Sequence, residues 1–261
     1  MKLSIVTTVK NEEKNIQNFI ESVLIQEAPW ELIIVDSMST DKTANIIEEY
    51  SKKMDNIKLI KKKCSRGEGR NIGVANSSSE YVVFTDGDVV LDKSWLKCIR
   101  EDFENGNEIV AGKTISVGKS AFVDLERVEL YYNNMDITFP SCNLGYKKSL
   151  FLQIGGFDPI FITAEDIDLN LRALMQNKKI YYDERAIIHN KTRSNYAFFY
   201  KQAFWNGYGR KQLTLKHGGL WSNYKLKNMI NKKTFKFVPL SRLIVAISGY
   251  LYCKLSKGGF K

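Results

Sequence analysis

Mainly apolar runs alternate with stretches of helical periodicity along the first part of the chain. The runs predict buried strands at residues 3–9, 32–35, 57–60 and 81–85. Between them, apolar side chains recur with helical spacing, first at Ile16, Phe19, Ile20, Val23 and Leu24 and then at Ala44, Ile47 and Tyr50. This alternation predicts an α/β fold in which helices cover both faces of a mainly parallel sheet.

Polar residues follow three of the predicted strands directly, at Asn11–Glu13, Asp36–Asp41 and Asp86–Asp88. In open sheets of this kind, ligands bind beyond the carboxyl ends of the strands. These three segments are therefore the candidates for a binding site. Asn11 is also well placed to cap the first helix, and this purely structural role is the alternative interpretation for it.

Asp86-Gly87-Asp88 sets two carboxylates two residues apart where a buried strand ends. Carboxylate oxygens favour Mg²⁺ or Mn²⁺, and such an ion can neutralise the charge on a departing diphosphate. The alternative is an ordinary Asp-Gly turn. Position after a buried strand favours the metal site.

Four motifs occur in an order that resembles one enzyme family. They are Ser4–Glu13, Val35–Asp41, Asp86–Asp88, and Gly155–Asp158 followed by Glu165-Asp166-Ile167-Asp168. Together they resemble the family 2 inverting glycosyltransferases over roughly residues 1 to 195. The resemblance implies a GT-A fold with a Rossmann-like sheet. It also implies metal-dependent sugar transfer from a nucleotide diphosphate sugar, with uridine diphosphate as the expected nucleotide.

The same resemblance implies roles for single residues. On the donor side, Asp36 would accept hydrogen bonds from the nucleobase, while backbone at Thr7 and Val9 and the side chain of Glu12 or Glu13 would hold base and ribose. On the acceptor side, Asp166 would be the general base, with Glu165 and Gly156 contacting the acceptor. The alternative for the acidic cluster at Glu165 to Asp168 is compensation of a helix dipole, with Thr163 as the cap.

Cationic residues and a histidine complete the expected site. Some relatives use a histidine as a further metal or phosphate ligand, so His189 is a candidate beside Asp86 and Asp88; a structural strand-end histidine is the alternative. Arg70 and Arg193 are expected to contact the diphosphate, since guanidinium matches phosphate bidentately. Arg66 is a third candidate for the diphosphate, but for this residue a solvated basic surface is the favoured interpretation.

Glycines at residues 67, 69 and 73 resemble a dinucleotide fingerprint only superficially. Their spacing is G-x-G-x-x-x-G, and they do not open the first strand-to-helix turn. A dehydrogenase is therefore excluded, and the glycines are interpreted as turn and helix-start residues.

Basic charge is concentrated at the end of the chain. Residues 185–261 hold 16 of the 39 Lys and Arg residues and no Asp or Glu, which leaves 23 basic against 29 acidic residues before them. We expect a catalytic domain at 1–215, with a nucleotide-sugar half at 1–110 and an acceptor half at 111–215, and a basic, partly amphipathic helical appendage at 216–261. Its apolar stretch, 237–253, is predicted to lie on an anionic membrane surface.

The four cysteines lie far apart, without metal-ligand or disulfide-scaffold spacing, and are expected to be reduced thiols. The first apolar run is too short for a signal peptide. Both observations favour a cytoplasmic enzyme, held peripherally at the inner face of the cell membrane.

Two alternative functions stay open at this stage. A nucleotidyltransferase of GT-A-like fold would also use acids and a metal, but it usually opens with a glycine-rich basic phosphate loop that is absent between Thr7 and Glu13. A noncatalytic nucleic-acid-binding protein would explain the basic end but not the acidic motifs. The expected partners are therefore a nucleotide-sugar donor and a glycan or lipid-linked acceptor, without nucleic acid.

Overall fold

The computed structural model describes residues 1–118, 128–191, 195–220 and 237–256. The strands are β1 (Leu3–Val9), β2 (Trp30–Asp36), β3 (Ile57–Lys61), β4 (Tyr81–Thr85), β5 (Val89–Leu91), β6 (Ile109–Val117), β7 (Tyr131–Tyr132), β8 (Met135–Asp136), β9 (Asn143–Lys147) and β10 (Tyr181–Lys191). The helices are α1 (Ile16–Leu24), α2 (Thr43–Ser51), α3 (Arg66–Ala75), α4 (Trp95–Glu104), α6 (Lys148–Gln153), α7 (Glu165–Met175), α8 (Tyr196–His217) and α10 (Phe237–Leu255).

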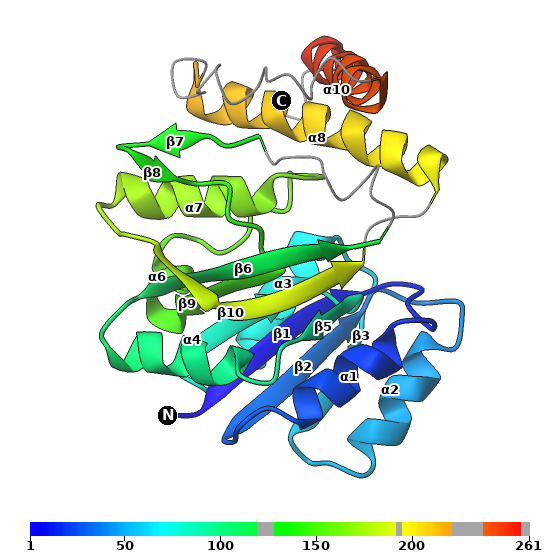
Figure 1. Cartoon of the computed structure of the whole chain (residues 1–261), viewed down its shortest axis with the longest axis vertical. Coiled ribbons are helices and arrows are strands. Elements are labelled where there is room, and N and C mark those ends of the chain that lie inside the picture. Colours follow the sequence, from blue (N-terminus) through cyan, green and yellow to red (C-terminus); the bar gives the residue numbers. More distant parts are fainter. Residues whose placement is uncertain (119–127, 192–194, 221–236, 257–261) are drawn as a thin grey trace.

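Eight strands form one twisted sheet in the order β3-β2-β1-β4-β9-β6-β10-β5 (Figure 1). Four of its seven pairings are parallel, and the antiparallel ones involve β9 and the edge strand β5. The predicted α/β fold with a mainly parallel sheet is confirmed. Because β1, β2 and β4 run side by side in parallel, the segments that follow them meet at one edge of the sheet.

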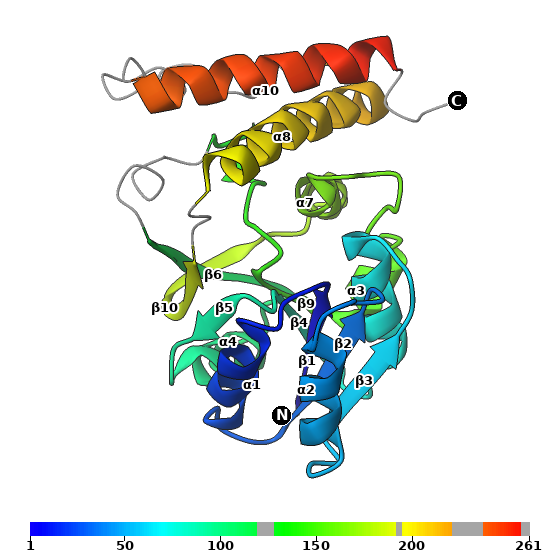
Figure 2. The ribbon, with the colours of Figure 1, turned by 90° about the vertical axis from the view of Figure 1, so that its right-hand side faces the viewer.

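Helices cover both faces of the sheet (Figure 2). Each face has its own apolar core. Alternate residues of β1 divide between the two cores: Ile5 packs with α1 and α4, and Val6 packs with α3, α6 and α7. This is the period of a strand buried on both sides.

Helix α3 lies unusually close to β1, and glycines make this approach possible. A β-carbon at Gly69 would lie 2.4 Å from the Thr8 side chain, and one at Gly73 would lie 2.3 Å from Val6. Gly69 lies in the first turn of α3, in agreement with the predicted helix-start glycines, whereas Gly73 lies further along the helix. They are needed because any side chain would push α3 away from the sheet.

Two predicted helix caps are also wrong. Helix α1 is preceded by Asn15, and Asn11 instead accepts a hydrogen bond from the Thr40 backbone. Helix α7 is preceded by Ala164, while the Thr163 hydroxyl donates to the Trp205 carbonyl of α8. In both cases a tertiary partner competes successfully for the capping side chain.

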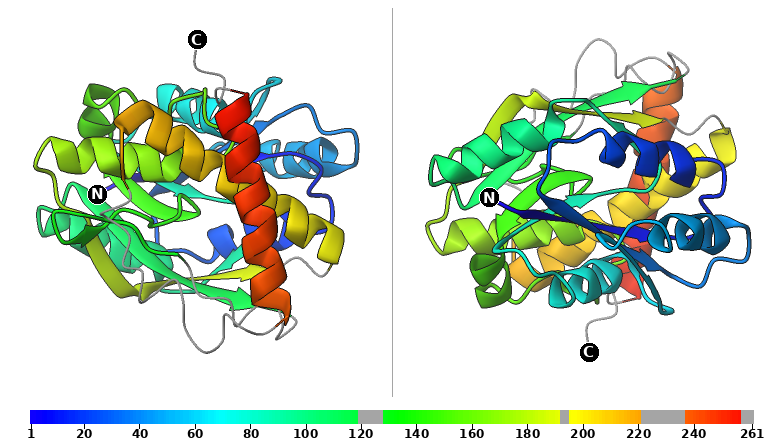
Figure 3. Two further views of the ribbon diagram at one scale, coloured as in Figure 1. Left: turned by 90° about the horizontal axis from the view of Figure 1, so that it is seen from above. Right: turned by 90° about the horizontal axis from the view of Figure 1, so that it is seen from below.

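Helices α8 and α10 form an outer layer at one end of the molecule, and α10 crosses α8 on the side away from the sheet (Figures 1 and 3). None of the helices in the described part of the chain is both long and apolar enough to cross a membrane. The four cysteines form no disulfide with one another. The predicted boundary at residue 110 falls inside β6, and the boundary at 215 falls inside the last turn of α8.

Two carboxyl groups are buried together where α4 meets β10. Asp102 and Asp183 are hydrogen-bonded to each other, and Arg185 lies 2.9 Å from Asp183 and 3.7 Å from Asp102. Burial, followed by the charge of Asp183, raises the pKa of Asp102 from 3.8 to about 7. The pair therefore shares a proton at mildly acidic pH.

We expect Asp102→Asn to stabilise the protein above neutral pH. An acid whose pKa is raised by folding binds its proton more tightly in the folded chain, so its contribution to stability is lost as pH rises from 3.8 towards about 7. The substituted amide keeps a hydrogen-bond donor for Asp183 and never ionises. The melting temperature should exceed that of the wild type by about 2 to 4 °C at about pH 8, and by much less at about pH 5. An equal difference at both pH values would contradict this assignment.

Candidate active site

The segments that follow β1 and β2 are joined to each other by hydrogen bonds. The Asn11 backbone N–H donates to the Ser39 hydroxyl at 2.9 Å, and the Asn11 side-chain oxygen accepts from the Thr40 N–H at 2.8 Å. The Glu13 carboxylate accepts from the Lys42 N–H at 3.2 Å. These bonds make one rigid edge from two loops that are distant in sequence.

Asp36 lies inside this edge and is almost completely buried. Its carboxylate accepts from the Ser39 backbone at 3.1 Å and from the Ser39 hydroxyl. A carboxylate has about four acceptor positions, so it keeps capacity for a further donor. Its contact with a nucleobase stays a prediction.

Thr7, Val9 and Glu12 occupy the inner side of the same edge. The Thr7 hydroxyl is fully buried and has no hydrogen-bond partner, while the Val9 carbonyl accepts from the Ser37 N–H at 2.8 Å. The Glu12 carboxylate accepts from the Asn15 side chain at 2.8 Å, and Glu13 is exposed. The nucleotide contacts predicted for these four residues remain predictions.

Arg70 of α3 connects the predicted donor and acceptor sides. It is 0% exposed, and its guanidinium lies 2.6 Å from the Asp86 carboxylate and 3.0 Å from the Glu165 carboxylate. The guanidinium carbon of Arg70 also lies 5.4 Å from the centre of the Phe157 ring. Arg70 thus holds Asp86 and Glu165 together from inside. The predicted contact of Arg70 with a diphosphate remains a prediction, and in this conformation the guanidinium faces the protein interior.

Arg66, one turn before Arg70, lies at the mouth of the same cluster. Its side chain is half exposed and lies 3.7 Å from Glu165. The charge of Glu165 raises the pKa of Arg66, and Asp86, Asp166 and Asp88 add to this effect against the opposing influence of burial. Arg66 therefore lies among four carboxylates. The expected solvent exposure of Arg66 is confirmed, but its charged neighbours are acidic and not basic.

Asp166 lies at the start of α7 and is half-buried. Its two carboxylate oxygens accept from the backbone N–H groups of Ser141 at 3.1 Å and of Ile167 at 2.8 Å. Burial, followed by the charge of Glu165, raises the pKa of Asp166 above its ordinary value, although these hydrogen bonds and Arg70 oppose the shift. A base whose pKa is closer to the working pH accepts a proton more effectively.

Strained backbone borders these acidic and polar segments. Met38 and Ala164 have φ values of +56° and +66°, in the left-handed region that side chains with a β-carbon rarely adopt. Met38 follows Asp36 by two residues, and Ala164 directly precedes Glu165. Strain of this kind gathers at functional sites, where the surrounding structure holds it in place.

The Gly155–Asp158 segment is fixed by α3 and α7. The Asn71 side chain donates a hydrogen bond to the Phe157 carbonyl at 2.7 Å and accepts one from the Phe157 N–H at 2.9 Å. The Gly156 carbonyl accepts a hydrogen bond from Arg172 at 2.6 Å. Gly156 has a φ of +63°. Its predicted contact with the acceptor remains a prediction.

The end of α8 holds α7 through Asp168. This buried carboxylate lies 2.7 Å from His217 and 2.8 Å from Lys216, and Lys216 also lies 2.7 Å from Asp158. Burial acts to raise the pKa of Asp168, but His217, Arg172 and Lys216 outweigh it and lower the pKa. The chain beyond residue 215 thus supports the helix that carries Asp166.

Asp86 and Asp88 leave β4 towards this cluster, with both side chains partly accessible. His189 lies in β10 opposite Val90 of β5. No group of three or more metal-ligating side chains is assembled in the described part of the chain. Two carboxylates still match Mg²⁺ or Mn²⁺, which usually take one or two carboxylates together with phosphate oxygens and water. The donor set therefore fits the predicted metal, and His189 as a further ligand remains a prediction.

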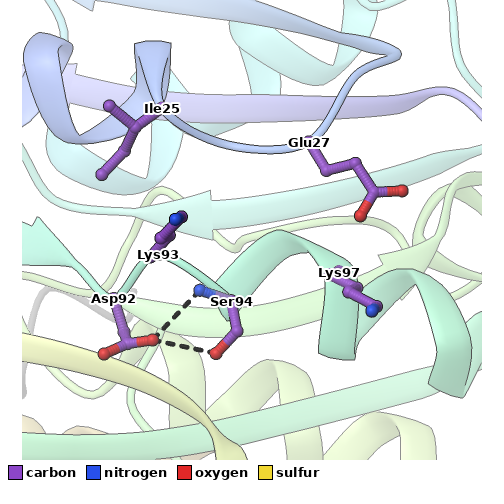
Figure 4. Close-up of a pocket in the computed structure, with 6 residues that line it drawn as sticks. All are labelled: Ile25, Glu27, Asp92, Lys93, Ser94 and Lys97. Atoms are coloured by element: carbon purple, nitrogen blue, oxygen red, sulfur yellow. Dashed lines mark hydrogen bonds between the residues drawn. The ribbon is translucent and has the colours of Figure 1, made fainter.

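One predicted residue is not described by the structure, and one hollow contains no predicted residue. Arg193, predicted to contact the diphosphate, lies outside the described residues. A shallow hollow between the end of α1 and the start of α4 holds none of the predicted site residues (Figure 4). Ile25, Glu27, Asp92, Lys93, Ser94 and Lys97 line it. In this hollow the Asp92 carboxylate accepts hydrogen bonds from the Ser94 N–H at 3.0 Å and from the Ser94 hydroxyl at 2.9 Å.

The family model described as glycosyl transferase family 2 matches residues 4–157, more than half of the chain. The chain belongs to glycosyl transferase family 2. The matched range contains the segments after β1, β2 and β4 and the glycine pair before Phe157. The predicted family is thereby confirmed.

Two of the similar proteins are named for reactions that involve polymers. The chain is 27% identical to a poly-beta-1,6-N-acetyl-D-glucosamine synthase of Staphylococcus epidermidis over 87% of this chain and 58% of the relative. It is 30% identical to a poly(ribitol-phosphate) beta-glucosyltransferase of Bacillus spizizenii over 69% of this chain and 30% of the relative. The chain therefore spans less than two thirds of either protein.

Solved structures share the fold. TarS 1–349 of Staphylococcus aureus, in complex with UDP-GlcNAc, matches with a TM-score of 0.63 and 19% identity over 97% of this chain and 81% of that one. The mannosyltransferase PcManGT of Pyrobaculum calidifontis, in complex with GDP-Man and Mn²⁺, matches with a TM-score of 0.67 and 14% identity over 97% of this chain and 75% of that one. The predicted GT-A fold is confirmed.

Sequence reasoning undervalued or missed several residues that build the site, chiefly Arg66, Asn71, Ser141, Lys216 and His217. One available signal was the Ser65-x-x-Glu68 capping box, which the structure contains and which places Arg66 at the start of a helix. No sequence signal links Lys216 or His217 to Asp168, because that contact depends on how α8 packs.

Proposed function

We propose that this family member transfers a sugar from a nucleotide diphosphate sugar to an acceptor hydroxyl, with a divalent metal and with inversion at the anomeric carbon. The observation that carries the proposal is the meeting of Asp86, Asp88, Glu165 and Asp166 around two arginines. The proposed metal-binding pair, Asp86 and Asp88, and the proposed base would then share one site. Direct displacement requires this proximity.

Asp166 is proposed as the general base. It would take the proton from the acceptor hydroxyl as that oxygen attacks the anomeric carbon, on the face opposite the departing diphosphate. The raised pKa of Asp166 suits this task, and its hydrogen bonds from Ser141 and Ile167 hold the carboxylate in a defined orientation. Glu165 and Gly156 are proposed on the acceptor side.

The leaving group is proposed to meet positive charge at the opposite side of the cluster. Asp86 and Asp88, with His189 as a further candidate, would hold Mn²⁺ or Mg²⁺, which neutralises charge on the diphosphate when bound. Arg66 is half exposed at the mouth of the cluster, so its guanidinium can reach a phosphate without leaving the protein surface. Arg70 would keep Asp86 oriented from inside, and Arg193 stays a candidate phosphate contact.

A UDP-sugar is the proposed donor, in keeping with the UDP-GlcNAc bound by TarS, which has the same fold. Asp36, Glu12, Glu13 and the backbone at Thr7 and Val9 are the proposed nucleotide contacts. The proposed acceptor is a glycan or lipid-linked glycan, because the relatives named above build a polysaccharide or modify poly(ribitol-phosphate). A cytoplasmic position close to the membrane is proposed for the enzyme, with no nucleic-acid partner.

Thermal shift with a panel of nucleotide sugars, with and without Mn²⁺, tests the donor. A ligand at about 100 times its dissociation constant stabilises the folded state by about 2.7 kcal/mol. We expect a UDP-sugar with Mn²⁺ to raise the melting temperature clearly more than the same sugar with chelator. Slow donor hydrolysis should then release UDP. Absence of any nucleotide-sugar effect would contradict the proposal. Release of pyrophosphate from a nucleoside triphosphate and a sugar phosphate would favour a nucleotidyltransferase instead.

A further inference from the structure

Helix α10 presents an apolar stripe to the outside of the molecule. Five aliphatic side chains on it are between 43% and 83% exposed: Leu240, Ile244, Ile247, Leu251 and Leu255. At about 100° per residue they fall within an arc of about 80°. Exposed aliphatic residues scattered over a surface are ordinary, but a continuous stripe along one helix marks an interaction surface.

The opposite face of α10 is occupied by α8. A β-carbon at Gly249 would lie 1.9 Å from the Phe204 carbonyl, and one at Gly207 of α8 would lie 1.8 Å from the Ala246 carbonyl. Tyr200 and Ser241 are hydrogen-bonded at 2.7 Å. The two helices are therefore in backbone contact. Figures 2 and 3 show α10 as the outermost helix of the molecule. Because its contact with α8 fixes the rotation of α10, the exposed stripe lies on the side of the helix away from α8.

Arg242 interrupts the apolar run in the sequence but not in the structure. It lies about 200° around the helix from Leu240 and is half-buried, on the side that faces α8. Lys254 is exposed and borders the stripe near its end. The outward surface of α10 is thus apolar along its centre, with a cation at its margin.

We infer that the outward stripe of α10 is the surface by which this protein docks on a membrane containing anionic lipid. A helix with one apolar face and basic surroundings lies in the headgroup region with its apolar side chains inserted. This inference goes beyond the proposed transfer reaction and does not depend on it.

Charge selects lipid over a second copy of the chain. Helices α8 and α10, which form this outer layer, contain six Lys and Arg residues and no acid, so two copies meeting through α10 would bring like charges together. An anionic lipid surface attracts the same charges. Tyr196 and Phe198, at the start of α8, add exposed aromatic rings of the kind favoured at a membrane interface.

Vesicle sedimentation tests the surface directly. The probe is a vesicle of phosphatidylcholine with about one third phosphatidylglycerol, compared with phosphatidylcholine alone, at about 0.05 M and about 0.5 M salt. We expect the full chain to bind the anionic vesicles at low salt and to dissociate at high salt. The triple variant Ile244→Gln, Ile247→Gln and Leu251→Gln should bind at least about tenfold more weakly.

The matched control changes three equally exposed apolar side chains elsewhere: Ile25→Gln, Leu152→Gln and Met175→Gln. It should bind as the wild type does. If the α10 triple variant folds poorly, an environment-sensitive dye attached at Leu251→Cys replaces it, and its fluorescence should rise on addition of anionic vesicles.

Three results would overturn the inference. They are absence of binding to anionic vesicles at low salt, undiminished binding by the folded α10 variant, and a dye that does not respond to vesicles. A dimer of the wild type that dissociates in the α10 variant, without any vesicle binding, would assign the stripe to a second copy. Loss of glycosyl transfer does not enter this test, so failure of the proposed function remains distinguishable.

Discussion

Asp166→Asn is expected to lower the turnover number by about 10² to 10⁴, while donor affinity stays within a few fold. The amide has almost the shape of the carboxylate and keeps an oxygen for the Ile167 N–H, but it cannot take a proton from the acceptor. Steady-state transfer, with donor binding measured separately, checks the prediction. The acid limb of the pH profile of turnover should also vanish, since it reports the ionisation of this base.

Two comparisons make the Asp166 result interpretable. Asp55→Asn, the same change at an exposed position away from the site, should leave turnover unchanged. Glu165→Gln is expected to act differently, because it removes the charge that faces buried Arg70 and should lower stability. If Glu165→Gln abolished turnover in a folded protein while Asp166→Asn had little effect, Glu165 would be the base.

Asp88→Ala is expected to abolish transfer and to remove the part of nucleotide binding that depends on Mn²⁺. The physical reason is loss of one of two carboxylates that would hold the cation beside the diphosphate. Titration calorimetry with the nucleotide, with and without Mn²⁺, measures the effect. Asp88 is a cleaner target than Asp86, whose removal would also deprive buried Arg70 of a partner 2.6 Å away.

The fold of the Asp88→Ala variant should be unchanged, which its melting temperature without ligand can establish. Asp55→Ala serves as the surface control. Full activity of the wild type in excess chelator, or normal turnover by Asp88→Ala, would exclude metal assistance at this position.

The structure also guides how the C-terminal region should be truncated. Removing everything after residue 215 would delete Lys216 and His217, which hold Asp158 and Asp168 next to the proposed base. Such a truncation would disturb the catalytic part together with α10. Substitutions confined to the outer stripe of α10 separate the two effects.

Much of the donor side could be predicted from sequence alone. Strand β1 was predicted at residues 3–9 and begins and ends at those residues, and β4 agrees equally well. Strand β2 is longer than its apolar run, because pairing with β1 extends to Asp36. These segments are predictable because a strand buried on both faces is mainly apolar, and clusters of polar side chains follow where it leaves the sheet.

Contacts between distant helices could not be predicted in this way. Arg70 and Glu165 are 95 residues apart, and nothing in either local sequence specifies their ion pair. The approach of α3 to β1 depends on Gly69 and Gly73, whose role is invisible until Thr8 and Val6 are seen opposite them. For the same reason, the acidic surroundings of the exposed Arg66 were not predicted.

By itself, the sequence determined the alternation of strands and helices, the acidic and polar segments at the strand ends, and the family. Only the tertiary structure decided that Arg66 and Arg70 join the acids of both halves, that α8 supports Asp168, and that the apolar stripe of α10 faces outwards. The physical reason is the separation along the chain over which each kind of interaction acts. Periodicity and turn chemistry act over a few neighbouring residues, whereas the partner of a buried charge is determined by which helices pack together.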